Sequence, residues 1–345
     1  MNILVTGGAG YIGSHACRRL LADGHSVTVI DNLFRGHAAA IDRLRTLPGV
    51  TADRLVFQRA DIADRPLVER LLRERGIQAI IHFAALAYVG ESVQQPLKYW
   101  EVDCAGALSL LAAADAADVR TFIFSSTCAT YGEPPESEIP IRETTPQRPI
   151  NPYGAAKLAF ERILSDYADL RAAQQRPFAY ALLRYFNVAG CDPTGLLGED
   201  HTPETHLIPV VLQTILGQRP AITIFGTDYP TPDGTCIRDY IHVDDLVDAH
   251  VAVMNALKPG ERRIYNLGIG KGCSVRQIID AARRVTGRDF KVLEGARRPG
   301  DPPTLYCDPS KIRRELGWTA RITDVDEIVA TAWRWFERHP RGYAG

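Results

Sequence analysis

The amino-acid sequence predicts an α/β fold in which a doubly wound, parallel sheet is followed by a smaller, mixed α/β domain on the C-terminal side. Two observations support this class. Short runs rich in β-branched residues alternate with longer amphipathic runs up to about residue 186, a pattern typical of a parallel sheet covered by helices. Beyond Gly190 the alternation loosens and Pro- and Gly-rich stretches appear, which is typical of loops arranged around a ligand.

The periodicity places the elements of the alternating part. We expect the first domain to cover residues 1–186 and the second 187–345, with segments around 235–255 returning to the first. A ligand should lie at the carboxyl ends of the strands, as is usual in doubly wound folds. The expected strands are residues 3–6, 26–30, 54–57, 79–83, 120–124 and 179–184, and the expected helices include 11–22, 65–74, 97–117 and 153–171.

The composition excludes several classes of function. Lys and Arg number 40 against 41 acidic residues, so no basic excess points to a nucleic-acid partner. The 7 cysteines form no C-x-x-C pair, and we expect reduced core residues and no metal site. The first strand starts without a charged leader, and no apolar run approaches the ~20 residues of a membrane span. We therefore expect a cytoplasmic protein without a membrane partner.

A glycine-rich loop lies between the first expected strand and the first expected helix, with the sequence T-G-G-A-G-Y-I-G (Thr6–Gly13). Gly7 permits a tight turn, Gly10 lets the backbone approach a pyrophosphate, and Gly13 lets the helix pack closely on the strand. The helix N-terminus offers free N–H groups and a partial positive charge to phosphates. This strand–loop–helix context predicts a Rossmann-type dinucleotide site.

Asp31 ends the second expected strand, where a carboxylate can accept hydrogen bonds from the adenosine ribose. Because a carboxylate there repels the 2′-phosphate of NADP, the expected cofactor is NAD. The alternative is an acid in an ordinary Asp31-Asn32 turn. Asp61 and Ile62, just beyond the third strand, form a candidate adenine-contacting pair, although a surface loop also explains them.

Tyr153 and Lys157 lie four residues apart at the start of an expected helix, with Asn151 as its N-cap and Pro152 in its first turn. Oxidation of a sugar hydroxyl needs a base, and a free tyrosine has a pKa of about 10. A lysine ammonium one turn away favours the phenolate. The alternative is a pair on a solvent-facing helix, but the position after the fifth strand of a nucleotide fold favours catalysis.

Hydroxyl side chains gather where the fifth strand ends, in the run S-S-T-C-A-T-Y-G (Ser125–Gly132). We expect Thr127 to hydrogen-bond the substrate hydroxyl. Ser125, Ser126 and Thr130 are expected to make only local caps or backbone bonds.

Taken together, these features resemble the extended short-chain dehydrogenase/reductase superfamily, and within it the UDP-glucose (UDP-galactose) 4-epimerase family. The resemblance runs through nearly the whole chain. The stretches that carry it are G-G-A-G-Y-I-G-S (Gly7–Ser14), D-N-L (Asp31–Leu33), H-F-A-A (His82–Ala85), V-G-E-S-V (Val89–Val93), N-P-Y-G (Asn151–Gly154), L-R-Y-F-N (Leu183–Asn187), D-G-T-C-I-R-D-Y-I-H-V-D-D-L (Asp233–Leu246) and R-P-G-D (Arg298–Asp301).

The resemblance implies a redox-neutral cycle on tightly bound NAD that inverts C4 of a UDP-sugar through a 4-keto intermediate. It implies that Tyr153, assisted by Thr127, takes the C4 hydroxyl proton, and that Lys157 binds the nicotinamide ribose and tunes Tyr153. The implied cofactor contacts are Gly7, Gly10, Tyr11, Ile12, Gly13, Asp31, Asn32, Asp61, Ile62, Phe83, Ala84, Ala85, Tyr153, Lys157 and Tyr185. The implied substrate contacts are Thr127, Asn187, His206, Leu207, Arg238, Tyr240, Arg298 and Asp301.

Some of these substrate residues also have simpler interpretations. The guanidinium groups of Arg238 and Arg298 can each form bidentate hydrogen bonds to a diphosphate. Alternatively, Arg298 could be a solvated neighbour of Arg297, and Arg238 could pair with Asp239. His206 stands where relatives carry an asparagine and could instead be a helix-entry histidine. Two further positions depart from the family, since Ala87 replaces a lysine and Asp103 replaces an asparagine.

A narrower resemblance leaves a second substrate class open. The run Ser125–Gly132 and the C-terminal H-P-R-G-Y-A (His339–Ala344) are similar to a branch that includes plant UDP-xylose (UDP-arabinose) 4-epimerases. Dehydratases of the same superfamily need acidic residues after Thr127, where this chain has Cys128 and Ala129. A non-catalytic NAD-binding sensor is the remaining alternative. Relatives are often homodimers, and the apolar face of helix 97–117 could form such an interface.

Overall fold

The structure is a computed structural model that describes residues 1–298 and 301–344. The chain forms two compact units. The first unit consists of Met1–Gly132, Pro146–Arg184 and Val247–Tyr265, and the second of Glu133–Thr145, Tyr185–Leu246 and Asn266–Gly345.

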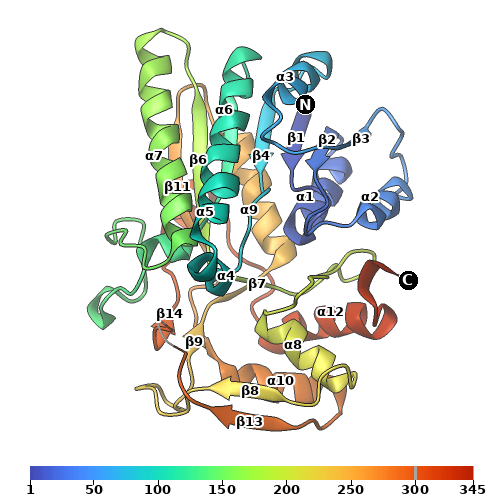
Figure 1. Ribbon diagram of the computed structural model, residues 1–345, viewed down its shortest axis with the longest axis vertical. Coiled ribbons are helices and arrows are strands. Elements are labelled where there is room, and N and C mark those ends of the chain that lie inside the picture. The colour runs from blue at the N-terminus through green and yellow to red at the C-terminus, as the bar shows by residue number, and fades with distance from the viewer. Residues whose placement is uncertain (299–300, 345) are drawn as a thin grey trace. The chain divides into compact units, whose positions relative to one another are not determined.

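A seven-stranded sheet forms the centre of the first unit, in the order β11-β6-β5-β4-β1-β2-β3 (Figure 1). The pairs β1·β2, β2·β3, β1·β4 and β4·β5 are all parallel. The chain order reverses between β1 and β4, the point where doubly wound sheets bind their ligands. The strands are β1 (Asn2–Thr6), β2 (Ser26–Asp31), β3 (Leu55–Arg59), β4 (Ala79–His82), β5 (Thr121–Thr127), β6 (Ala179–Tyr185) and β11 (Arg262–Leu267).

Helices cover both faces of this sheet. Leu4, Phe122 and Phe160 belong to one buried cluster between the sheet and the helices α3, α6 and α7. Ile3 and Val5 alternate with Leu4 along β1 and point to the opposite face, which α1 covers. The helices of this unit are α1 (Tyr11–Ala22), α2 (Ala38–Arg45), α3 (Arg65–Glu74), α4 (Val89–Gln94), α5 (Pro96–Tyr99), α6 (Ala107–Ala116), α7 (Pro152–Ala173) and α9 (Val243–Ala256), which begins in the second unit.

The predicted strands all appear, and the predicted helices 11–22 and 65–74 have the expected bounds. The predicted helix 97–117 is also present as a continuous helical run, but its geometry is not α-helical throughout. A π-helical segment, Trp100–Gly106, separates α5 from α6. Within it the buried Asp103 accepts a hydrogen bond from the Leu86 N–H at 2.8 Å, an interaction that a period-3.6 pattern cannot reveal.

The second unit is a smaller mixed α/β assembly, so the predicted fold class is confirmed. Its strands form the short sheets β10-β7, β12-β9-β14 and β13-β8. Trp335, Val211 and Ile278 anchor a core between its helices. The elements are β7 (Asn187–Ala189), α8 (Leu207–Ile215), β8 (Ile222–Phe225), β9 (Ile237–Arg238), β10 (Tyr240–His242), β12 (Cys273–Ser274), α10 (Val275–Thr286), β13 (Val292–Gly295), β14 (Thr304–Leu305), α11 (Ser310–Leu316) and α12 (Val325–Arg338).

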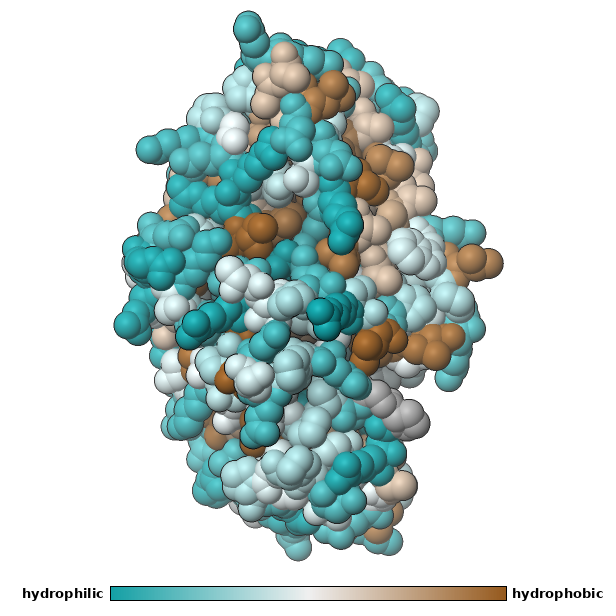
Figure 2. Space-filling model, turned by 90° about the vertical axis from the view of Figure 1, so that its left-hand side faces the viewer, coloured by the Kyte–Doolittle hydropathy of each residue, from teal (hydrophilic) through white to brown (hydrophobic). Residues whose placement is uncertain are grey.

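The surface is mainly hydrophilic on the face drawn in Figure 2, where hydrophobic residues form small, separate patches. Within the described residues, none of the helices combines the length and the apolar character that crossing a bilayer requires.

A buried ion pair joins β6 to α7 in the first unit. Arg184 donates to the two carboxylate oxygens of Glu161 at 2.9 and 2.6 Å, and both side chains are almost fully buried. Glu161 also accepts from the Ser126 hydroxyl at 2.5 Å and from Gln147 at 3.0 Å. The carboxylate therefore ties the end of β5 to the helix that carries Tyr153 and Lys157.

We predict that Arg184→Leu lowers the free energy of unfolding by about 3–5 kcal/mol, because it leaves the Glu161 carboxylate buried without its cation. Urea denaturation followed by circular dichroism measures the change. Arg45→Leu is the control, since it removes an exposed ion pair with Asp42 that contributes less than about 1 kcal/mol. Equal losses in the two variants would show that the buried pair has no special importance.

Candidate dinucleotide and catalytic site

The glycine loop has the backbone geometry that its sequence predicts. Gly7 has a φ of 70°, and a Cβ there would lie 2.7 Å from the Ala84 backbone nitrogen. A Cβ on Gly13 would collide with the Gly7 carbonyl. Gly10 is different, because its Cβ would meet only the Gly7 oxygen, at 3.3 Å. Side chains at positions 7 and 13 would therefore collide with the backbone of the protein. Position 10, where α1 begins, has room for a ligand.

Asp31 is buried at the end of β2 and binds the glycine loop. Its carboxylate accepts from the Ala9 N–H at 3.0 Å and from the Leu33 N–H at 2.8 Å. Burial raises the pKa of this carboxyl, and the backbone N–H groups partly offset the rise. The Leu33 bond shows that Asp31 does form a local turn. Asn32 donates to Asp61 at 2.9 Å, which brings two of the predicted adenosine contacts together.

Residues Phe83–Ala85 follow β4 directly beside the glycine loop. A Cβ on Gly7 would touch both Ala84 and the Phe83 carbonyl carbon. The strands are also joined by their side chains, because His82 Nδ1 lies 2.6 Å from the Thr6 hydroxyl. Parallel pairing thus places the ends of β1, β2 and β4 at one edge of the sheet.

Tyr153 and Lys157 lie in the first two turns of α7. The predicted cap is present, since Asn151 accepts from the Gly154 N–H at 2.9 Å. A Cβ on Gly154 would collide with the Ala129 carbonyl, so the helix start packs tightly on the segment after β5. Ala129 also packs against the buried cluster that contains Tyr153. Thr127, which ends β5, accepts from the Ala129 N–H at 3.1 Å and is itself 6% exposed.

Lys157 is a buried cation, so the alternative of a solvent-facing Tyr153/Lys157 pair is wrong. Its side chain is 3% exposed, and its ammonium donates to the Ser125 carbonyl at 3.2 Å and lies 4.9 Å from the Phe124 ring centroid. Burial lowers the pKa of Lys157, while the negative charges of Asp103 and Glu161 raise it. The fold thus holds a positive charge next to the tyrosine.

The hydroxyl groups near Thr127 have different partners from those expected. Thr130 does make a local bond, to the Thr127 carbonyl at 2.9 Å. Ser126 instead binds Glu161, and Ser125 lies 3.0 Å from the Nε2 atom of His250 on α9. The expectation of purely local bonds is wrong for these two serines, because neighbouring helices supply polar partners.

Asp103 lies on the π-helical segment, which packs against α7, the helix that carries Tyr153 and Lys157. Its side chain is 1% exposed, and its Oδ2 has no hydrogen-bond partner among the described residues. Burial raises the pKa of Asp103 to about 6, although Lys157 acts in the opposite direction. Ala87, the other departure from the family, is exposed.

Two of the predicted substrate residues of the second unit, Arg238 and Asp301, contact each other. Arg238 pairs with Asp301 at 2.9 Å, so the proposed pair with Asp239 is wrong. Asp239 instead accepts from the N–H groups of Ile269 and Gly270. Arg298 is exposed, with its guanidinium 4.0 Å from the centroid of the Phe225 ring.

The remaining predicted positions lie on separate elements. Asn187 begins β7, Tyr240 begins β10 and is buried, and Tyr185 ends β6. His206 is the N-cap residue of α8, and Leu207 is its first residue. Pro299 and Gly300 of the R-P-G-D stretch lie outside the described residues.

Sequence reasoning missed the supporting role of Glu161. A signal was available, because Tyr153, Lys157 and Glu161 follow one another at intervals of four residues and so share one face of α7. Its partner Arg184 could not be foreseen, since it comes from a different element.

The chain is similar to known proteins over its full length. A profile described as "NAD dependent epimerase/dehydratase family" matches residues 3–268. The UDP-glucose 4-epimerase of Lacticaseibacillus casei is 45% identical over 344 residues, which cover 99% of each chain. The UDP-arabinose 4-epimerase 1 of Arabidopsis thaliana is 48% identical over 99% of this chain and 81% of the plant protein.

Solved structures agree with these matches. The UDP-glucose 4-epimerase of Bifidobacterium longum, in complex with NAD⁺ and UDP, is 38% identical with a TM-score of 0.92, covering 99% of this chain and 100% of that one. The extent of these matches, together with the glycine loop and the buried Tyr153/Lys157 pair, shows that the protein belongs to the NAD dependent epimerase/dehydratase family.

Proposed function

We propose that the protein is a UDP-sugar 4-epimerase that works on bound NAD. The single observation that carries the proposal is the buried Lys157 one helical turn from the buried Tyr153, at the start of a helix packed on the end of β5. A base held next to a fixed positive charge is what removal of a proton from a sugar hydroxyl requires. The names of the relatives supply the substrate class.

The residues of the first unit fit NAD. Gly10 leaves space at the N-terminus of α1 for a pyrophosphate, and Asp31 lies beside it with two carboxylate oxygens that can accept further bonds from a ribose. Asn32 and Asp61 stand together near the same edge, where the adenosine would bind. Bound NAD would supply a reversible hydride acceptor for C4 of the sugar.

The protein side of the reaction is acid–base chemistry. Tyr153 takes the proton of the C4 hydroxyl and returns it at the end of the cycle, and Thr127 hydrogen-bonds the same hydroxyl. Lys157 stabilises the Tyr153 phenolate and binds the nicotinamide ribose. Arg238 and Arg298 bind the diphosphate, with Asn187, Leu207, Tyr240 and Asp301 as further UDP-sugar contacts. His206 is also predicted to contact the substrate.

The preferred substrate pair is UDP-glucose and UDP-galactose. The bacterial relatives with this name match over 99% of both chains. The pair UDP-xylose and UDP-arabinose is the second candidate, because the plant UDP-arabinose 4-epimerase is as similar in sequence. Dehydration is disfavoured since Cys128 and Ala129 follow Thr127, and a buried Tyr153/Lys157 pair argues against a sensor.

A cytoplasmic homodimer is part of the same proposal. Leu97, Trp100 and Leu108 are large apolar residues that are 74%, 39% and 47% exposed along α5, the π-helical segment and α6. Such a surface is suited to a second copy of the chain. All 7 cysteines lie within the described residues and none forms a disulfide, which fits a reducing compartment.

We predict that the purified protein interconverts UDP-glucose and UDP-galactose without added NAD, and that Tyr153→Phe lowers turnover by about 10²–10⁴-fold because the base is lost. Chromatography of the four UDP-sugars measures the conversion and identifies the faster pair. Tyr167→Phe serves as the control, since Tyr167 lies on the same helix and binds Asp115 and Arg171. If Tyr153→Phe retained full turnover, or if no UDP-sugar reacted even with NAD supplied, the proposal would fail.

We further predict that Asp103→Asn stabilises the protein at pH 8 and leaves its stability unchanged at pH 4. The folded-state pKa of Asp103 is about 6, above its usual 3.8, so the folded protein holds this proton more tightly than the unfolded chain does. The carboxylate therefore costs stability as the pH rises from about 4 through 6, by about 1–3 kcal/mol in all. Urea denaturation at both pH values checks this, with the exposed Asp42→Asn as control. If Asp103→Asn raised the free energy of unfolding equally at pH 4 and pH 8, the raised pKa of Asp103 would be contradicted.

A further inference from the structure

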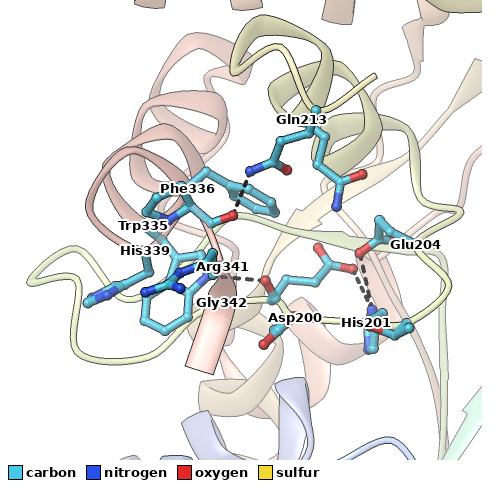
Figure 3. Close-up of a pocket in the computed structure, with 13 residues that line it drawn as sticks. Asp200, His201, Glu204, Gln213, Trp335, Phe336, His339, Arg341 and Gly342 are labelled. Carbon is cyan, nitrogen blue, oxygen red and sulfur yellow. Dashed lines mark hydrogen bonds and ion pairs between the residues drawn. The ribbon is translucent and has the colours of Figure 1, made fainter. Parts of the chain in front are cut away.

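Two histidines and two glutamates converge in the loop that precedes α8. Glu199, His201, Glu204 and His206 follow the pattern E-x-H-x-x-E-x-H, and one ligand atom from each lies within 4.8 Å of all the others. The glutamate side chains are only 4% and 2% exposed. Figure 3 shows His201 and Glu204 turned toward each other. None of the four is among the proposed acid–base residues, and a metal bound here would replace the substrate contact predicted for His206.

The shortest contacts of the cluster are close to the ligand spacing of a tetrahedral metal centre, and Glu204 approaches the two histidines through different carboxylate oxygens. The Nδ1 atom of His206 lies 2.9 Å from Glu199 Oε1 and 3.0 Å from Glu204 Oε1. The Nδ1 atom of His201 lies 3.2 Å from Glu199 Oε1 and 3.5 Å from Glu204 Oε2. Zinc bonds of about 2.0–2.1 Å place neighbouring ligands of a tetrahedron about 3.3 Å apart.

The buried carboxylates of Glu199 and Glu204 set the charge of the cluster. Two carboxylates that are removed from water need positive partners. Without a metal these partners are the two imidazolium rings. A divalent cation would balance the same two negative charges and leave both imidazoles neutral.

We propose that Glu199, His201, Glu204 and His206 bind one divalent transition-metal ion, with zinc as the best fit to two imidazole nitrogens and two carboxylate oxygens. Because the protein supplies all four ligands, the centre is structural and has no open position for catalysis.

The position of the cluster shows what the metal would stabilise. His206 is the N-cap residue of α8, so the ion would fix the start of that helix. Trp335 of α12 donates from its indole to the Glu199 carbonyl at 3.1 Å, and the Tyr343 N–H donates to Asp200 at 2.8 Å. The centre would thus hold three segments of the second unit together: the loop, the start of α8 and the C-terminal helix.

A cavity of about 210 Å³ borders three of the four residues. Glu199 is one of its lining residues. His201 and Glu204 line one side of it, and the C-terminal residues Trp335 and His339 line the other (Figure 3). The His339 ring packs against Trp335 with ring centroids 4.3 Å apart and an interplanar angle of 51°, and His339 is not among the four ligands. It therefore provides a matched control in the same cavity.

The test measures metal on the full-length protein. The protein is first treated with a chelator, dialysed and then incubated with Zn²⁺. We expect one zinc ion per chain to be retained through gel filtration, as counted by elemental analysis, and the melting temperature to rise relative to the metal-free protein. His201→Asn and Glu204→Gln should each reduce zinc retention at least about tenfold, whereas His339→Asn should retain it. Mg²⁺ should cause no rise in melting temperature.

Cobalt gives a second readout that does not depend on the variants folding well. Co²⁺ bound to the wild-type protein should show the intense visible absorption bands of tetrahedral coordination, and zinc should displace it. The proposal is overturned if the folded wild-type protein neither retains zinc nor shows these bands. It is equally overturned if His201→Asn and Glu204→Gln, folded by circular dichroism, bind zinc as the wild-type protein does.

Discussion

The parallel pairing of β1, β2, β4 and β5 is the constraint on which the first unit depends. Strands that run in the same direction have their carboxyl ends at one edge of the sheet. The glycine loop, Asp31, Phe83–Ala85 and Thr127 each follow or end one of these strands, so they share that edge although they are far apart in sequence. The helix that carries Tyr153 and Lys157 then packs on the segment after β5. The site is thus a consequence of strand direction and chain order.

Burying Lys157 at this edge costs free energy, because an ammonium group loses its hydration there. The Ser125 carbonyl, the Phe124 ring and the negative charges of Asp103 and Glu161 offset part of the cost. The incompletely bonded Asp103 is a further cost. We interpret the burial of Lys157 and the incomplete hydrogen bonding of Asp103 as two features that lower stability. Together they keep a positive charge fixed beside Tyr153 in a water-poor environment.

Local features of this site were predictable from the sequence, and long-range ones were not. The turn at Gly7, the close packing at Gly13 and the Asn151 cap depend on residues a few positions apart, so their spacing reveals them. The π-helical segment depends on where Asp103 is buried. The partner of Arg238 is Asp301, from a distant part of the chain, and no local pattern distinguishes it from Asp239. Cysteine spacing does not reveal the glutamate–histidine cluster, whose four ligands come from one irregular loop.

The central claim is that C4 of the sugar is inverted by moving its hydride to bound NAD and back. The most direct test follows deuterium at C4 of UDP-[4-²H]glucose during conversion to UDP-galactose in ordinary water, by NMR and mass spectrometry. The account predicts that the deuterium remains at C4 in the product, because a hydride held within the enzyme does not exchange with solvent. Loss of the deuterium to water would show that C4 is inverted by proton exchange, and would contradict the account.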